Sequence, residues 1–420
     1  MYDWANSVYS LTISSAIFPA YYETVTEINN SDMVSFFGLT IDNTSLYSYG
    51  LAFAFLFVAF VSPILGGIAD YVGNKKPFMK AFAYTGAIAC ISMFWFTDVS
   101  MLEFGIIAMV IAAIGFTGSL VFYNAYLPEI APKEEHDQIS AKGFSYGYIG
   151  SVILLIINLV LIMFHDKFGL EKGFATRLAF VMVGIWWIGF SQITFANMPK
   201  SKKGIKPKNL LSNGFNELGK VWKEFQSIAY LRRFIPAFFF FTIGVQTVIY
   251  LAANFGSDVL GMETEQLIVS ILLIQIVAIG GSYLFSTLSK KIGNVKALII
   301  CVTAWMFICA GAYFVTSVNA FYIVAAFVGM VMGGVQSLSR STYSKMLPPT
   351  NDTASYFSFY DVTEKIATAI GLLSFGLIVQ LTGSMPNAIL ALIVFFVIGL
   401  VLLLRVKFST NDVKTQGNLE

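Results

Sequence analysis

The sequence has 420 residues, of which 57% are hydrophobic and 12% are charged, and its mean hydropathy is +0.73. Soluble domains usually carry about 25% charged residues, so this composition excludes an ordinary soluble protein and predicts an integral membrane protein. The formal net charge of +2 says nothing about nucleic acid, because in a membrane protein the place of each charge matters more than the sum.

Twelve apolar segments of about 20 residues, the length that spans a bilayer as a helix, follow one another along the chain. The first six lie near 2–22, 46–67, 78–97, 102–127, 141–164 and 175–196. The second six lie near 233–255, 264–287, 296–316, 319–346, 355–381 and 386–406. We therefore expect an all-α protein with an N-terminal six-helix bundle over 1–196, a cytoplasmic linker over 197–232, a C-terminal six-helix bundle over 233–407 and a polar tail over 408–420.

The first predicted helix, which begins MYDWANSVYS, carries a polar stripe among apolar residues. An ionised aspartate at the centre of a membrane helix costs about 2.5–3.5 kcal/mol, so the stripe should face protein or water. Because this helix begins at residue 2 with no basic segment before it, we expect no cleaved signal peptide and a native start upstream of Met1. The stripe falls on an arc of roughly 100° and consists of Asp3, Asn6, Ser7, Ser10 and Ser14.

Basic residues divide unevenly between the two ends of the predicted helices. All but three of the 26 Lys and Arg lie in the loops after even-numbered helices, at the ends of those helices or in the tail, and the exceptions are Lys167, Lys172 and Arg177. Cytoplasmic loops attract Lys and Arg. We therefore expect both termini to be cytoplasmic, in the inner membrane of a bacterium.

The loop between the second and third predicted helices reads GGIADYVGNKK at 66–76. Its glycines allow close backbone approach and, at Gly73, a tight turn. Asp70 can accept hydrogen bonds from the N-terminus of a neighbouring helix, while Lys75 and Lys76 can anchor the loop at an anionic leaflet. This loop is either a well-made turn or a gating latch.

An internal repeat supports a duplicated architecture. Two pairs of segments match at the same offset of 220 residues, ADYVGNKK at 69–76 with SKKIGNVK at 289–296, and YNAYLP at 123–128 with YSKMLP at 343–348. Two halves running in the same direction are typical of parallel repeats related by an axis along the membrane normal.

The 66–76 motif resembles the G-x-x-x-D-(R/K)-x-G-x-(R/K)-(R/K) signature of the major facilitator superfamily. With YDWANS at 2–7, YNAYLPEIA at 123–131 and GGVQSLSRS at 333–341, the whole chain resembles the vacuole-effluxer-like branch, which is related to fungal vacuolar amino-acid exporters. The resemblance implies two pseudo-symmetric six-helix bundles and alternating access through a cavity lined by the first, fourth, seventh and tenth helices.

The chain departs from the superfamily pattern in several places. Tyr71 stands where a basic residue is usual, and Lys290 occupies the position of Asp70 in the second copy, so the acidic latch is expected only in the first. The fourth helix has no arginine, and the fifth lacks the proline typical of drug/proton antiporters. The resemblance therefore does not favour a multidrug exporter.

Polar residues at helical spacing recur in the four segments that the resemblance assigns to the cavity. Each alone fits an interhelical hydrogen bond, but their recurrence favours a polar pathway. We expect the substrate to be bound by Asp3, Asn6, Ser10, Tyr123, Gln246, Tyr250, Asn254, Gln336 and Arg340.

The densest charge in a predicted helix lies in YFSFYDVTEKIATAIG at 356–371, where Asp361 and Lys365 are i, i+4 neighbours beside Glu364. Arg340 could pair with Glu364 or Asp361. These residues form either a static ion-pair cluster or a gate that breaks and re-forms in each cycle. The gating candidates are Asp70, Gly73, Lys75, Lys76, Arg340, Asp361, Glu364 and Lys365, and the candidates for carrying a coupling proton are Asp3, Asp361 and Glu364.

The linker contains apolar residues spaced for an amphipathic helix able to lie at the headgroup boundary. A structural link between the two halves is a simpler role for it than a regulatory partner site. The apolar positions are Leu211, Phe215, Leu218, Trp222 and Phe225.

The leading hypothesis is a secondary transporter for a small polar or zwitterionic solute, with proton coupling as one option. The resemblance suggests amino acids as the solute. A carrier of lipid-like amphiphiles and a non-transporting sensor on the same fold are the alternatives. We expect no enzyme, because no nucleophile–base set or phosphate loop is present and both histidines, His136 and His165, fall in predicted loops. We expect a monomer with no cofactor, metal or nucleic-acid partner, in contact only with its solute and with membrane lipids.

Overall fold

The computed structural model describes residues 1–27, 33–199 and 210–408, and the side chains of residues 210 and 211 are outside this description. Part of the predicted linker (200–209) and the predicted tail beyond Phe408 lie outside the described residues. Within them, eleven helices are long and apolar enough to cross a membrane.

The long helices follow the predicted segments closely. They are α3 (Asn43–Val72), α4 (Lys76–Ser92), α5 (Leu102–Asn124), α7 (His136–Met163), α8 (Lys172–Asn197), α10 (Ala229–Leu260), α11 (Thr264–Ile292), α12 (Asn294–Tyr313), α13 (Val318–Met346), α14 (Thr353–Thr382) and α15 (Met385–Leu404). The helices outside the predicted membrane segments are α6 (Leu127–Ile130), α9 (Leu210–Ser227), and the 3₁₀ turns η2 (Met93–Trp95), η3 (Val99–Met101), η4 (Lys133–Glu135) and η5 (His165–Phe168).

The first predicted helix forms as three consecutive pieces. These are α1 (Tyr2–Val8), the π-helix η1 (Tyr9–Ile17) and α2 (Phe18–Thr26). A nine-residue π segment is long, since π-helix usually occurs as single-turn bulges at functional sites. With this segment, each of the twelve predicted helices has a counterpart in the structure.

A β-hairpin lies in the stretch 23–45, where only a loop was predicted. Strands β1 (Met33–Phe36) and β2 (Leu39–Asp42) pair in antiparallel register. The turn between them places Phe37 at φ 48° and Gly38 at φ 82°, the left-handed pair that two-residue hairpins favour. Four-residue strands are too short to register in a window of about 20 residues chosen for membrane helices.

The chain forms two compact units whose borders cross individual helices. The first unit comprises 1–61, 74–123 and 146–201, and the second comprises 62–73, 124–145 and 202–420. The final turns of α3 and the first turns of α7 therefore belong to the second unit. The division into bundles over 1–196 and 233–407 remains a prediction.

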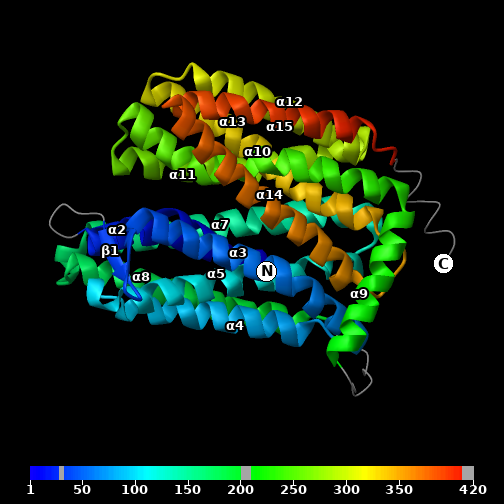
Figure 1. Cartoon of the computed structure of the whole chain (residues 1–420), viewed down its shortest axis with the longest axis horizontal. Helices are drawn as coiled ribbons and strands as arrows, with labels where there is room; N and C mark the ends of the chain where they lie inside the picture. Colours follow the sequence, from blue (N-terminus) through cyan, green and yellow to red (C-terminus); the bar gives the residue numbers. More distant parts are fainter. Residues whose placement is uncertain (28–32, 200–209, 409–420) are drawn as a thin grey trace. The chain divides into compact units, whose positions relative to one another are not determined.

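In the first unit, α4 packs along α8, and Figure 1 shows the two helices side by side. Gly86 of α4 lies against the ring of Trp187 of α8 and against Gly115 of α5, so a side chain at Gly86 would collide with both. Trp187 is fully buried. Small residues thus let three helices approach closely, as is usual in membrane bundles.

In the second unit, α11 and α13 pack against each other with close approach of their backbones. A Cβ atom added at Gly329, Gly333 or Gly281 would overlap a backbone carbonyl oxygen of the facing helix. This confirms that the glycines of the tenth predicted helix permit tight packing.

Helix α9 runs across the ends of the long helices of its unit (Figure 1). Its buried face includes Val221 and Phe225, and the ring of Phe225 lies 5.8 Å from that of Phe359 on α14. Phe215 and Trp222, expected on the same apolar face, are 54% and 46% exposed. A helix thus forms where an amphipathic helix was predicted, and Trp222 also packs on α14, with its ring 5.3 Å from that of Phe359, whereas Phe215 lies at the surface.

A polar contact also ties α9 to α14. Lys220 lies 2.8 Å from Glu217 and 3.1 Å from Asp352, the residue before α14. Hydrogen bonds to Glu217 and Asp352 raise the pKa of the Lys220 ammonium above its ordinary value. The ammonium is largely exposed, so this contact orients α9 more than it stabilises the fold.

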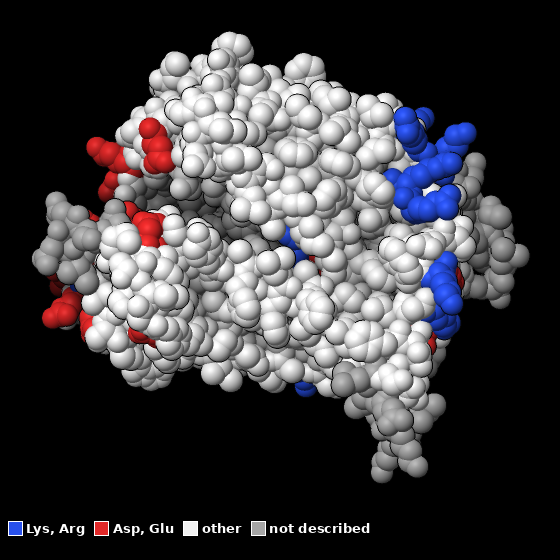
Figure 2. Space-filling model, viewed as in Figure 1, with Lys and Arg blue, Asp and Glu red and all other residues white. Residues whose placement is uncertain are grey.

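Charges separate along the helix axes of the second unit. The junction between α10 and α11 is acidic and the opposite helix ends are basic, and Figure 2 shows most of the red groups at one end of the helices and most of the blue groups at the other. This separation agrees with the predicted distribution of loop charges. The acidic residues are Asp258, Glu263 and Glu265, and the basic ones include Arg232, Arg233, Lys290, Lys291, Lys296, Arg405 and Lys407.

Candidate functional site

The polar stripe of the first helix points into the first unit. Asp3 is 4% exposed and accepts a hydrogen bond from the hydroxyl group of Tyr123 on α5. The Tyr2 and Tyr123 rings are 5.0 Å apart, and a Cβ atom at Gly147 of α7 would lie 3.4 Å from the Asp3 Cβ. Asp3 and Tyr123, expected on two cavity helices, are thus in direct contact.

Two further residues of this stripe differ in their partners. Ser10 is half-buried and donates a hydrogen bond to the Ser7 carbonyl oxygen at 3.0 Å. Asn6 is fully buried, and neither its amide nitrogen nor its amide oxygen has a hydrogen-bond partner among the described residues. A buried unpaired polar group costs about 1–3 kcal/mol. Asn6 is therefore a site candidate whose burial needs a functional explanation.

The second unit holds a polar site between α10 and α14. The amide of Gln246 donates to the Glu364 Oε1 at 2.9 Å, and the Lys365 Nζ lies 3.7 Å from that same oxygen. The Lys365 Nζ is also 3.7 Å from the Asp361 Oδ1. We call Asp361, Glu364 and Lys365 the α14 charge cluster. The structure joins Gln246, expected to bind substrate, to residues expected to form a gate.

The other residues of the substrate set lie around this site or apart from it. Tyr250, one turn after Gln246, is 36% exposed and interacts electrostatically with Lys365 and Glu364. Asn254 is exposed, and Gln336 on α13 is half-buried. The candidate site therefore centres on Gln246 and Tyr250, near the middle of α10, and does not extend along the whole predicted stripe to Asn254.

Arg340 binds residues other than the carboxylates considered for it. Its Nε donates to the Ser140 Oγ at 2.9 Å, and its two terminal nitrogens donate to the Ser140 carbonyl oxygen at 3.0 Å and to the Asn124 Oδ1 at 3.3 Å. The guanidinium also lies 4.2 Å from the centre of the Phe144 ring. Among the described residues, the ion pairs of Asp361 and Glu364 are made by Lys365 instead, because Lys365 lies on the same helix within one turn.

The loop motif at 66–76 caps a helix. The two carboxylate oxygens of Asp70 accept the backbone N–H groups of Ala354 and Ser355, at 3.1 and 2.6 Å, at the start of α14. Gly73 adopts φ 67°, so the tight turn is confirmed. An anion at a helix N-terminus satisfies orphan N–H groups and meets the positive end of the helix dipole.

The two lysines of this loop differ in exposure. Lys75 is 6% exposed, whereas Lys76 is half-buried. Only Lys76 therefore has the surface exposure that an anchor at a lipid headgroup requires.

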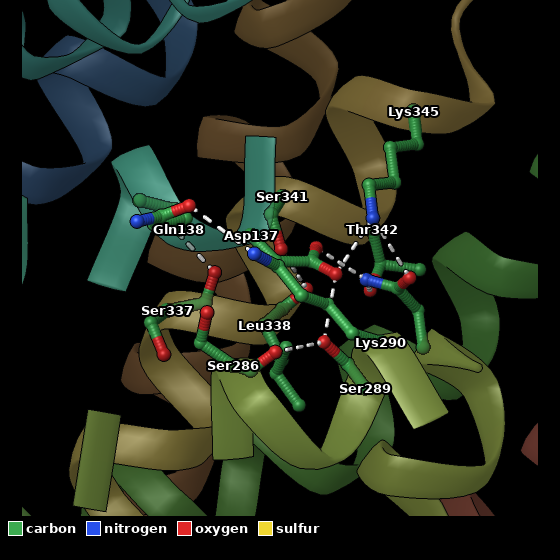
Figure 3. Close-up of polar contacts among 12 residues, drawn as sticks. Asp137, Gln138, Ser286, Ser289, Lys290, Ser337, Leu338, Ser341, Thr342 and Lys345 are labelled. Carbon is green, nitrogen blue, oxygen red and sulfur yellow. Dashed lines mark hydrogen bonds and ion pairs between the residues drawn. The ribbon is translucent and has the colours of Figure 1, made fainter. Parts of the chain in front are cut away.

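A buried charge network at the start of α7 was not predicted from the sequence (Figure 3). The Asp137 Oδ2 lies 2.6 Å from the Lys345 Nζ and accepts a hydrogen bond from the Ser289 Oγ at 2.7 Å. Asn294 donates to the Asp137 Oδ1 at 2.6 Å and accepts from Lys345 at 3.1 Å. The side chain of Asp137 is completely buried and that of Lys345 is 7% exposed.

The second motif copy contains no carboxylate of its own, as expected from Lys290, but it contacts a carboxylate from another helix. Ser289, Gly293 and Asn294 belong to the second copy, and they hold the carboxylate of Asp137, which comes from α7. The fifth helix was predicted to start at 141 and begins at His136, so Asp137 was assigned to a loop. The sequence signal that could have indicated a polar contact here was the asparagine that recurs at the same position of both motif copies, Asn74 and Asn294.

The histidines are also placed differently from the prediction. His136 is the first residue of α7 and is 1% exposed, with its ring nitrogen 3.1 Å from the Ala131 carbonyl oxygen. His165 lies in the 3₁₀ turn η5. Both histidines therefore lie in helical turns, because these turns extend beyond the ends of the apolar segments from which the helices were predicted.

Comparison with known proteins agrees with this architecture. The family described as "Vacuole effluxer Atg22 like" matches residues 1–415. The chain is 32% identical to the Bacillus subtilis (strain 168) "Uncharacterized MFS-type transporter YxiO", over 100% of this chain and 96% of that protein.

A fungal relative and a solved structure extend the similarity. "Autophagy-related protein 22" of Cryptococcus neoformans var. neoformans serotype D (strain B-3501A) is 30% identical over 64% of this chain and 52% of its own length. The E. coli fucose:proton symporter FucP superposes with a TM-score of 0.70 at 13% identity, covering 97% of this chain and 96% of FucP. The chain has the major facilitator fold and belongs to the vacuole effluxer Atg22-like family of major facilitator superfamily transporters.

Proposed function

We propose that this transporter moves a small polar or zwitterionic solute across the membrane by alternating access, with amino acids as the first candidates. The observation that carries the proposal is the site formed by Gln246, Glu364 and Lys365. These residues place a carboxylate, an ammonium and an amide next to one another where the apolar helices α10 and α14 meet. A solute with both an ammonium and a carboxylate matches this set of groups.

The first unit offers a second group of suitable side chains. Asp3 and Asn6 are buried polar residues of the stripe on the first helix, and ionisable groups in membrane helices usually mark a solute or ion pathway. The Bacillus subtilis relative, which is described as an MFS-type transporter and is 32% identical to this chain, supports transport as the function.

The cellular setting is part of the same proposal. The excess of Lys and Arg at one set of helix ends supports cytoplasmic termini in a bacterial inner membrane. We propose that the protein acts as a monomer surrounded by lipid, with the solute as its small-molecule partner.

Counterflow in proteoliposomes tests the function. Vesicles loaded with twenty unlabelled amino acids should take up a ¹⁴C-labelled amino-acid mixture faster than protein-free vesicles do. The variant Glu364→Gln should lose most of this exchange, because the solute ammonium loses its ion-pair partner, whereas Glu217→Gln on α9 should not. Equal rates with and without protein would contradict amino-acid transport, and binding without exchange would favour a sensor.

A further inference from the structure

The sequence predicts three carboxylates as candidates for binding a coupling proton, and their hydrogen bonds in the structure distinguish them. Asp3 accepts from Tyr123, and Glu364 accepts from Gln246. Asp361 is 2% exposed, and its Oδ2 atom has no hydrogen-bond donor among the described residues. A buried oxygen without a donor is poorly suited to carry negative charge and well suited to carry a proton.

The charges around Asp361 do not balance. The Lys365 Nζ lies at the same distance, 3.7 Å, from the Asp361 Oδ1 and from the Glu364 Oε1. One ammonium thus serves two carboxylates, and the α14 charge cluster carries one excess negative charge when both are ionised. Such a charge is unstable in a membrane interior unless a proton or another cation neutralises it.

Among the described residues, Lys365 is the only cation that forms an ion pair with Asp361. On α10, Gln246 and Tyr250 face Glu364 and Lys365, and α15 contains no charged residue. On α13, Arg340 donates hydrogen bonds to Ser140 and Asn124. Arg340 and Tyr343 also interact electrostatically with Tyr360 of α14. The charged residues of α9 contact the start of α14 at Asp352.

A proton fits the site better than a metal ion does. The described residues contain no group of three His, Cys, Asp or Glu side chains that could hold a metal. The Lys365 ammonium would also repel a cation placed between the carboxylates. Only one hydrogen bond acceptor, the Oδ2 atom of Asp361, is both buried and unoccupied by a donor within the cluster.

We propose that Asp361 binds the coupling proton, and that Lys365 makes this proton compete with the ammonium group of the solute at Glu364. When Asp361 is ionised, Lys365 is drawn to it and Glu364 can pair with the solute. When a proton forms an O–H bond on Asp361, Lys365 returns to Glu364 and the solute ammonium is displaced. The inference rests on the proposed function, and it predicts exchange of solute against protons.

Exposure supports this division of roles. The Glu364 side chain is 25% exposed, whereas that of Asp361 is 3% exposed. Glu364 can therefore meet a solute directly, while Asp361 is reached by a proton more readily than by a larger group.

The decisive experiment measures the pH dependence of counterflow with the ¹⁴C amino-acid mixture, comparing Asp361→Asn with the exposed control Asp258→Asn. For the wild-type protein and the control, the half-saturating concentration of the amino-acid mixture should fall about tenfold for each unit by which the pH rises, over the acidic range in which Asp361 is still protonated. In Asp361→Asn this dependence should vanish, exchange should persist at the weak level seen in acid, and transport driven by a proton gradient should stop. The conservative variant Asp361→Glu should restore a pH dependence.

Infrared difference spectra give a second measurement that needs no solute. The carbonyl band of a protonated carboxyl group should titrate in the wild-type protein and be missing in Asp361→Asn. An unchanged pH profile in Asp361→Asn, or an unchanged carbonyl band, would overturn the proton site. Absence of any exchange by the wild-type protein, with the band still present, would overturn the proposed function and leave the proton site standing.

Discussion

At the scale of single residues, two carboxylates of the second unit, Asp70 and Asp137, are held by different kinds of partner. Asp70 is held by backbone N–H groups at the start of α14, and Asp137 is held by Lys345, Asn294 and Ser289. The sequence predicted the first, because a capping carboxylate beside a glycine turn is a local pattern. The second depends on residues up to 208 positions apart, which no local pattern relates.

Breaking the Asp137 network should be costly. Asp137→Asn leaves the Lys345 ammonium buried without its counter-ion, so the free energy of unfolding should fall by about 3–5 kcal/mol. Unfolding of the purified protein by increasing denaturant measures this change. Replacing both partners, as Asp137→Asn with Lys345→Met, should recover much of the loss.

A matched control lies one residue away. Gln138 is exposed and accepts a hydrogen bond from Lys290 at 3.1 Å. Gln138→Ala should change the free energy of unfolding by less than about 1 kcal/mol, because exposed contacts to charged groups contribute little. Equal effects of Asp137→Asn and Gln138→Ala would show that burial of the ion pair does not matter.

At the scale of elements, small residues set how closely the helices approach. Gly281 of α11 faces the Met330 carbonyl oxygen of α13, whereas nothing lies within 4 Å of a Cβ atom placed at its neighbour Gly280. The sequence predicted close packing at Gly329 and Gly333 from their spacing. It could not tell which of two adjacent glycines faces a partner, because that depends on the rotation of each helix.

This neighbouring pair provides a direct comparison. Gly281→Ala should lower the free energy of unfolding by about 1–3 kcal/mol, because the added methyl group forces α11 and α13 apart. Gly280→Ala should be neutral or stabilising by up to about 1 kcal/mol, since alanine favours helix. Thermal unfolding in the same detergent measures both, and a larger loss from Gly280→Ala would refute the packing shown.

At the scale of the whole molecule, composition, charge asymmetry and the internal repeat predicted the twelve-helix fold. Hydrophobic segments of about 20 residues are a strong signal because the bilayer fixes their length. The hairpin at β1 and β2, the π segment η1 and the packing of α9 on α14 were not predictable in this way. Each depends on short-range backbone geometry or on tertiary contacts that hydropathy does not report.

The sequence assigns the candidate site residues to helices, but it does not give the contacts between them. Asp3 with Tyr123, and Gln246 with Glu364, were assigned to separate helices and lie in contact. Arg340 was expected near Glu364 and binds Ser140. Spacing along one helix gives the face of a residue, but the partner on another helix follows only from how the two helices pack.

We propose that the Gln246–Glu364 site faces water and binds an amino-acid-like solute. Tyr250 lies beside this site, and Ile366 lies on another face of α14. The two residues are 36% and 38% exposed, so cysteines introduced at these positions differ in their surroundings, water or lipid, more than in their exposed fraction. The native cysteines Cys90, Cys301 and Cys309 are buried and should not interfere. The measurement is the rate of modification of Tyr250→Cys and Ile366→Cys by a charged, membrane-impermeant thiol reagent, with and without the amino-acid mixture. We predict that Tyr250→Cys reacts, that the mixture slows it, and that Ile366→Cys stays unmodified; equal rates at the two positions, or no protection by the mixture, would contradict the claim.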